Sequence, residues 1–404
     1  MKEVIGGVCA PKGFRAGGIW CGIRKNKTKS DLAMIVSDTM CTAAGVYTKN
    51  KVKGAPIVVT KNHLADGHAQ AVICNSGNAN TCAPNGLEIA EETCALTAKA
   101  LGLLPTDIIV ASTGVIGKEM EIGPFATGIP QLADVLTYEG SQAAAHAIMT
   151  TDTKLKEVAV EFTVGGKTCH MGAIAKGSGM IHPNMATMLC FITTDAAISA
   201  PMLQKALSDD VPDSFNQVSV DRDTSTNDTV TIMANGMAGN DEITGEGEDY
   251  KAFTEALAFV TRKLSFCIAA DGEGASRTIV CQVNGAPTKE TARLVSRSVI
   301  SSNLFKAAVF GQDANWGRIL CAIGYTDAEF DIEPIDVTLS SKAGSLLVCE
   351  KAAHHEFSEE KALEILSEDV VTVEVEMHQG SGSATAWGCD LTYDYVKING
   401  DYRT

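Results

Sequence analysis

Three short apolar runs constrain the fold of this chain most strongly. They cover residues 71–74, 108–111 and 188–192, and none of them alternates apolar with polar residues. Such runs are typical of strands that are buried on both faces. Apolar residues with helical spacing lie between them, most clearly over 86–102, where the pattern stops at a glycine. We therefore predict alternating α and β elements with at least one mixed sheet.

The rest of the chain continues this alternation without an internal repeat. Further strands are predicted over 32–36, 55–60, 157–164, 169–175, 372–377 and 384–390, and near Val337 and Leu346. Further helices are predicted over 200–208, 249–268, 289–301 and 359–368, and the segment 124–147 has a mainly helical pattern.

Length and composition limit the classes of protein to consider. A chain of 404 residues, 45% of them hydrophobic, predicts two domains or lobes. A net charge of -16 argues against nucleic acid as a partner, because a phosphate-binding face needs clustered Lys and Arg. No segment reaches eighteen apolar residues free of charge, so we expect a soluble, cytoplasmic protein without a membrane partner. Its thirteen scattered cysteines form no CxxC pair and are expected to be reduced.

Glycine-rich segments invite a nucleotide-binding interpretation. The three strongest read KGSGMIHP, DGEGASR and HQGSGSATAWG. None has the GxGxxG or GxxxxGK[ST] spacing that places backbone N–H groups around phosphates, so we predict no nucleotide cofactor. No serine lies in a GxSxG elbow either, which leaves a serine hydrolase of that type without support.

Two groups of metal-ligand residue types have alternative explanations. The first group is His354, His355 and His378, which lie in a Lys/Glu-rich context typical of solvated histidines. The second group is Asp221, Asp223, Asn227 and Asp228. Its spacing fits no EF-hand loop, and Asx turns explain it as well as a metal site does. The prediction is that no metal is bound.

Thr187 lies at the junction between a Gly- and Pro-containing turn and the apolar run 188–192. The ordinary interpretation is that it begins a strand. The alternative is a nucleophile held at the end of a rigid element, which needs a base within hydrogen-bonding reach. The sequence places no histidine there. Cleavage of the preceding peptide bond would free an α-amine with a pKa of about 7.7 to 8.0, which could serve as that base.

Motifs along the whole chain resemble the ornithine acetyltransferases, also called glutamate N-acetyltransferases, of the cyclic arginine biosynthesis pathway. The motifs are GVCAPKGFRAGGIWCGIR, ASTGVIG, MTTDT, KGSGMIHPNMATML, DTSTNDT, DGEGA, GQDANWGRI and NGDYRT. The resemblance implies an α/β (α+β mixed) fold of the DmpA/ornithine-acetyltransferase type, with layered sheets flanked by helices and a smaller C-terminal lobe. A chance match of so many ordered motifs is negligible.

The resemblance also implies that the chain cuts itself between Ala186 and Thr187. The fragments 1–186 (α) and 187–404 (β) would then form one intertwined fold and assemble as a heterotetramer. Thr187 would be the nucleophile and, through its freed amine, the base. Thr113 and Gly114 would form the oxyanion hole, in agreement with a strand that ends in small polar residues and exposes backbone N–H groups.

The substrate contacts implied by the resemblance are Thr150, Lys176, Thr187, Glu273, Asn399 and Thr404. Lys176 could pair with the α-carboxylate of N2-acetylornithine, and Glu273 with its side-chain amine. The expected enzyme moves the acetyl group from N2-acetylornithine to glutamate without a cofactor. Whether acetyl-CoA is also a donor is left open. The alternatives are an N-terminal-nucleophile amidohydrolase or aminopeptidase of related fold and a non-catalytic binding protein.

Overall fold

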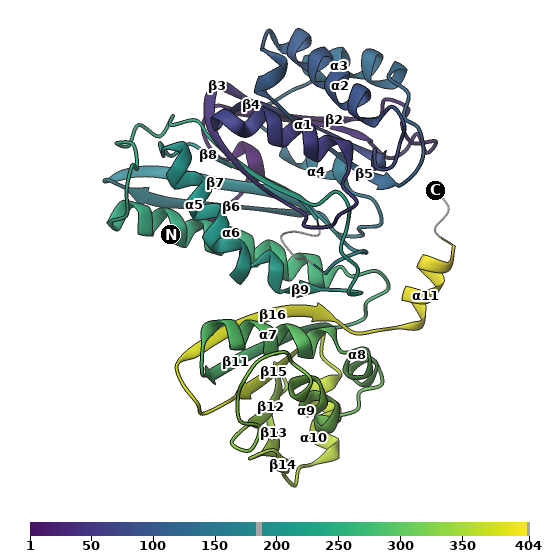
Figure 1. The fold of residues 1–404 in the computed structure, drawn as a ribbon, viewed down its shortest axis with the longest axis vertical. Coiled ribbons are helices and arrows are strands. Elements are labelled where there is room, and N and C mark those ends of the chain that lie inside the picture. The colour runs from purple at the N-terminus through teal and green to yellow at the C-terminus, as the bar shows by residue number, and fades with distance from the viewer. Residues whose placement is uncertain (183–187, 402–404) are drawn as a thin grey trace.

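The computed structural model describes residues 1–182 and 188–401, which form two mixed sheets flanked by helices (Figure 1). The nine-stranded sheet has the order β1-β6-β7-β8-β10-β3-β4-β5, with β2 paired to β3. Its strands are β1 Lys2–Val4, β2 Phe14–Ile19, β3 Leu32–Tyr47, β4 His68–Asn78, β5 Ile108–Val115, β6 Lys156–Val164, β7 Lys167–Lys176, β8 Leu189–Thr194 and β10 Thr229–Ala234. The apolar runs 71–74, 108–111 and 188–192 therefore belong to strands β4, β5 and β8 of one sheet.

The smaller sheet has the order β14-β13-β12-β15-β11-β16-β9. Its strands are β9 Val218–Ser219, β11 Thr278–Ala286, β12 Asp336–Ser341, β13 Gly344–Glu350, β14 Ala353–His354, β15 Val370–Glu376 and β16 Gly382–Cys389. With the helices α7 to α10 this sheet forms the lower lobe in Figure 1. The predicted mixed fold with a smaller C-terminal lobe is confirmed.

Helices cover the sheets and connect the two lobes. They are α1 Ala55–His63, α2 Gly86–Leu101, α3 Gly123–Asp134, α4 Ser141–Ile148, α5 Ala200–Asp210, α6 Glu248–Ala270, α7 Lys289–Ser301, α8 Asn303–Phe310, α9 Trp316–Gly324, α10 Glu359–Leu366 and α11 Tyr393–Gly400. Helix α6 packs on β6 and β7 of the larger sheet and on β16 of the smaller one, so a single helix ties the lobes together. Among the described residues, no helix has the length and apolar character needed to cross a membrane.

The predicted strand over 55–60 is wrong, because this segment begins α1. Its β-branched residues favour a strand locally, but Pro56 at the first turn of the helix already has a helical φ and has no N–H to satisfy. Ile57, Val59 and Thr60 are buried, and α1 packs against β5 and α2. Tertiary packing therefore overrides the local β propensity.

Strand β3 determines how the larger sheet curves. Its first part, to Val36, pairs with β2 and β4, and its last part, from Thr42, pairs with β10. Cys41 and Thr42 also pair with β4. The register with β4 shifts between Val36 and Cys41, which marks a bulge. Bulges bend a strand and increase its twist. The strand thus joins the part of the sheet that contains β4 to the part that contains β10.

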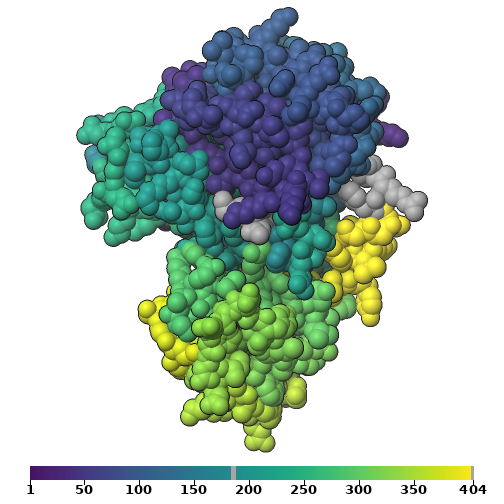
Figure 2. All heavy atoms as spheres, in the orientation of Figure 1, coloured from purple at the N-terminus to yellow at the C-terminus, as the bar shows by residue number. Residues whose placement is uncertain are grey.

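The last helix, α11, has no buried residue and lies on the surface beside the junction of the lobes (Figure 2). It begins after Thr392, whose side chain accepts a hydrogen bond from the N–H of Tyr395 as an N-cap. Reasoning from the sequence missed this helix. It matters because it carries Asn399 toward the larger sheet.

Candidate active site

The end of β5 forms one wall of a cavity of about 140 Å³, lined by Thr113 and Gly114 among others. Gly114 lies opposite Gly77 in the parallel pairing of β5 with β4. Its φ is 134°, and a Cβ at this position would lie 2.3 Å from the carbonyl carbon of Gly77. Only glycine fits here. The small residues after the apolar run therefore allow two strand ends to approach each other at the cavity.

Lys176 ends β7 and reaches the same cavity from another part of the sheet. Its Nζ lies 3.3 Å from Oγ1 of Thr113, and both residues are buried. An ammonium group can only donate, so the Thr113 oxygen accepts this hydrogen bond and its own O–H remains available as a donor. The structure brings together two residues that the sequence separates by 63 positions.

A buried network of charges supports the Lys176 segment. Asp152 accepts hydrogen bonds of 2.7 Å from the N–H of Gly177 and from Nζ of Lys156. The same ammonium lies 2.5 Å from Asp271, which also accepts from the N–H groups of Thr153 and Lys154. Burial alone would raise the pKa of Asp152, but Lys176 and Lys156 outweigh it and bring the pKa down to about 2.

Sequence reasoning missed this network. Asp152 and Asp271 do stand in the MTTDT and DGEGA motifs, which was the available signal.

Glu273 and Asn399 form the opposite side of the cavity. Nδ2 of Asn399 donates to Oε2 of Glu273 over 2.8 Å, and the Glu273 N–H donates to the carbonyl of Ser178 over 3.0 Å. A Cβ at Gly179 would lie 2.3 Å from the Glu273 carboxyl. The second glycine of KGSG therefore lets this carboxylate lie against the turn after Lys176.

The threonines of MTTDT have different surroundings. Thr150 and Thr151 line the cavity, and the Thr150 N–H donates to Asp152 over 3.0 Å. Thr153 instead hydrogen-bonds Asp271 through both its N–H and its hydroxyl. Asp152 is thus the residue that orients this turn.

Ala186, Thr187 and Thr404 lie outside the described residues. The next residue along the chain, Met188, lines a small inner cavity together with Thr113, Lys176 and Asp228. The first described residue after this gap therefore lies beside Lys176 and Thr113.

The two groups considered as metal sites have other contacts. Within 1–182 and 188–401, no three His, Cys, Asp or Glu side chains are arranged to hold a metal ion. Asp221 accepts from the N–H groups of Met180 and Ile181, at 2.7 and 2.8 Å. The His354 ring stacks on Trp316, and Nε2 of His378 lies 2.8 Å from Asp336.

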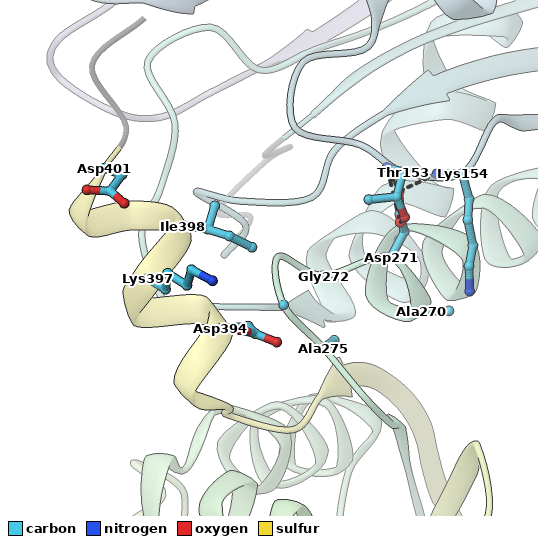
Figure 3. Close-up of a pocket in the computed structure, with 11 residues that line it drawn as sticks. Thr153, Lys154, Ala270, Asp271, Gly272, Ala275, Asp394, Lys397, Ile398 and Asp401 are labelled. Atoms are coloured by element: carbon cyan, nitrogen blue, oxygen red, sulfur yellow. Dashed lines mark hydrogen bonds between the residues drawn. The ribbon is translucent and has the colours of Figure 1, made fainter.

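A larger cavity of about 440 Å³ lies between α11 and the C-terminal end of α6 (Figure 3). Its lining includes Asp271, Asp394 and Lys397, and it shares no residue with the cavity around Lys176. Neighbouring residues of one segment line different cavities. Glu273 lines the cavity around Lys176, whereas Gly272 lines the larger cavity. The segment after α6 therefore separates them.

Comparison with known proteins agrees with this arrangement of motifs. The model of the ArgJ family matches residues 15–404. The arginine biosynthesis bifunctional protein ArgJ of Symbiobacterium thermophilum is 50% identical over 406 residues, which is 100% of both chains. ArgJ 1 of Clostridium acetobutylicum is 49% identical over 97% of this chain and 96% of its own. The crystal structure of ArgJ from Bacillus halodurans is 45% identical and has a TM-score of 0.51, covering 54% of this chain and 100% of that chain. This chain belongs to the ArgJ family of bifunctional acyltransferases of arginine biosynthesis.

Proposed function

We propose that this site transfers the acetyl group of N2-acetylornithine to the α-amine of glutamate through an acetyl ester on Thr187. The observation that carries the proposal is the contact of 3.3 Å between buried Lys176 and Thr113, beside Gly114 and Glu273 in one cavity. This set combines a cation for a carboxylate, an anion for an amine and donors for an oxyanion.

The proposed nucleophile becomes available when the peptide bond between Ala186 and Thr187 is cut. The position of Met188 in the inner cavity supports this, since Thr187 is its covalent neighbour. The crystallised ArgJ chain, aligned over its whole length, covers 54% of this chain. The fragment 187–404 holds 218 of the 404 residues, which is the same share. The fragments 1–186 and 187–404 would then be the two parts of one fold, each contributing strands to the larger sheet.

The reaction proceeds in two steps. Oγ of Thr187 attacks the acetyl carbonyl carbon, and its proton passes to the Thr187 α-amine. The negative charge on the carbonyl oxygen is stabilised by the Thr113 hydroxyl and the Gly114 N–H. The proton then passes to the departing α-amine of ornithine as the C–N bond breaks. In the second step the α-amine of glutamate attacks the ester carbonyl carbon and gives a proton to the Thr187 amine. That proton passes to Oγ1 of Thr187 as the ester C–O bond breaks, and N-acetylglutamate leaves.

Charge pairing orients the substrates. Lys176 pairs with the α-carboxylate of N2-acetylornithine, and Glu273 with its side-chain amine. Asn399 holds the Glu273 carboxyl in place. Thr150, which lines the cavity, and Thr404, which lies outside the described residues, complete the set of proposed substrate contacts.

We place the working enzyme in the cytoplasm as a heterotetramer of two fragments of each kind. The cysteines support the location, because all thirteen are free in the structure. Apolar side chains exposed on α11, among them Tyr393 at 83% and Val396 at 67%, support an assembly larger than one copy.

An acetate-release assay tests the function. Incubation with N2-acetylornithine should yield N-acetylglutamate only when glutamate is present, with little free acetate. Equal release of acetate with and without glutamate would instead establish the hydrolase alternative. Thr187→Ala should remain uncut and inactive, whereas a binding protein would keep its ligand affinity unchanged in this variant. Replacing N2-acetylornithine by acetyl-CoA in the same assay determines whether acetyl-CoA is a second donor.

A further inference from the structure

Asn227 is a buried residue, 6% exposed, and the hydrogen-bonding capacity of its side chain is fully used. Its Nδ2 donates to the carbonyl oxygens of Ala79 and Ser112, the second over 2.9 Å. Its Oδ1 accepts from the hydroxyl groups of Thr81 and Thr226, each over 2.6 Å. A carbonyl oxygen can only accept, so the amide nitrogen must face Ala79 and Ser112. An aspartate of the same shape could not make these two bonds at neutral pH, because a carboxylate has no N–H to donate.

The two carbonyl groups belong to the strand ends that carry the proposed oxyanion hole. Ala79 follows the last residue of β4, and Ser112 directly precedes Thr113 in β5. The pairing of these two parallel strands is irregular at this point, because the register shifts at Asn78. Asn227 therefore bridges β4 and β5 where their own ladder is interrupted.

Gly54 leaves room for the Asn227 side chain. A Cβ at position 54 would lie 2.6 Å from Nδ2 of Asn227 and 2.8 Å from Oγ1 of Thr81. The φ of Gly54 is -63°, which any residue can adopt, so space rather than backbone freedom explains the glycine. The Gly54 N–H also donates to the Thr226 carbonyl over 3.0 Å. The loop before α1 is thus shaped around the amide.

We propose that Asn227 is a positioning residue that fixes the orientation of the peptide bond between Ser112 and Thr113. In this way it aligns the two donors of the proposed oxyanion hole, the Thr113 hydroxyl and the Gly114 N–H. Such donors stabilise a transition state only when they are aligned beforehand, and a displacement of about 1 Å can lower the rate about 10²-fold. This role of Asn227 rests on the proposed function.

The test is a double-mutant cycle between Asn227 and Thr113 in the full-length protein. It compares wild type, Asn227→Ala, Thr113→Val and the double variant, with Asn62→Ala, at an exposed amide on α1, as the matched control. Thermal melting establishes folding, intact-mass spectrometry counts the cut chains, and kcat and KM for N2-acetylornithine are expressed per cut chain.

Asn227→Ala should lower kcat by about 10- to 100-fold, because the donors lose their alignment. KM should stay within about twofold of wild type, since the proposed contacts of Lys176 and Glu273 with the substrate remain. In the Thr113→Val background the same change should lower kcat by a factor at least about three times smaller, because one of the donors to be aligned is already absent. Asn62→Ala should leave both constants unchanged.

Thr81→Val is a second, milder variant. It keeps Asn227 and removes one of the two hydroxyl groups that orient its amide. We expect kcat to fall about fivefold, the equivalent of one hydrogen bond, with KM again unchanged.

The possible outcomes separate this role from the proposed function. A wild type that is never cut, or a Thr113→Val variant with the wild-type kcat, contradicts the proposed function and its oxyanion hole. If Thr113→Val loses activity while Asn227→Ala keeps the wild-type kcat, the role of Asn227 alone is wrong. Equal factors in the two backgrounds, or a change confined to KM, also overturn it, because Asn227 then acts independently of Thr113. The same conclusion follows if Asn227→Ala folds but stays wholly uncut, or if it does not fold and Thr81→Val has the wild-type kcat.

Discussion

Nζ of Lys176 and Oγ1 of Thr113 meet at 3.3 Å although four strands separate β7 from β5 in the larger sheet. In a flat sheet these two strands would lie about 24 Å apart at the usual spacing of about 4.8 Å. The contact shows that the ends of β7 and β5 lie much closer together than they would in a flat sheet. The cavity forms where these strand ends converge.

Replacing Thr113 by Val should lower kcat by about 10² to 10³, because one donor to the oxyanion is lost. The measurement is steady-state transfer from N2-acetylornithine to glutamate. Thr113→Ser keeps the hydroxyl and should retain most of the activity. A Val variant with the wild-type kcat would exclude Thr113 from the oxyanion hole.

Replacing Glu273 by Gln should lower kcat/KM for N2-acetylornithine by about 10- to 100-fold, the range expected when a charge-assisted hydrogen bond is lost. Asn399 can still contact the amide, so the variant should fold normally. The matched control is Glu290→Gln, an exposed carboxylate on α7. Equal kcat/KM values for wild type and Glu273→Gln would show that this residue does not bind the substrate amine.

Replacing Lys156 by Met should lower the free energy of unfolding by about 3 to 5 kcal/mol, because Asp152 and Asp271 would be left as uncompensated buried charges. Denaturant unfolding measures this. Lys205→Met, which breaks the exposed pair with Asp209, should leave the free energy of unfolding nearly unchanged, because water screens this pair. Similar losses in the two variants would contradict the structural importance of the buried network.

The stability should also depend on pH through Asp152. Its folded pKa of about 2 lies below the ordinary 3.8. Ionised Asp152 therefore contributes its full share to the free energy of unfolding above about pH 4. This contribution, roughly 2 kcal/mol, is lost as the pH falls toward 2. Unfolding curves of wild type and Asp152→Asn between pH 5 and about 2 measure the difference. A constant difference over this range would contradict the low pKa.

The sequence predicted those parts of the fold that depend on local patterns. The runs over 71–74, 108–111 and 188–192 were identified as strands because a strand buried on both faces carries no polar residue. The segment 55–60 was wrongly predicted as a strand, because its burial against β5 and α2 is a tertiary effect. Lys156 could not be recognised as a buried cation, since one of its partners, Asp271, lies 115 residues away.

The candidate site was predicted in its residues but not in its geometry. Motif resemblance named Thr113, Lys176 and Glu273, and the structure brings all three to one cavity. Their convergence depends on contacts between segments far apart in the sequence, such as the pair Lys176 and Thr113, which local patterns do not reveal. Asn227 was noted only as a member of an acidic cluster, because the carbonyl groups that its amide holds lie 115 and 148 residues away.

We propose that cleavage of the bond between Ala186 and Thr187 creates the catalytic nucleophile, Thr187. Intact-mass spectrometry of the purified protein, quenched in acid after brief incubation with N2-acetylornithine, tests it most directly. We predict two polypeptides, one ending at Ala186 and one beginning at Thr187, with an acetyl group added only to the second and located on Thr187. A single uncut chain with full activity, or an acetyl group on any other residue, would contradict the account.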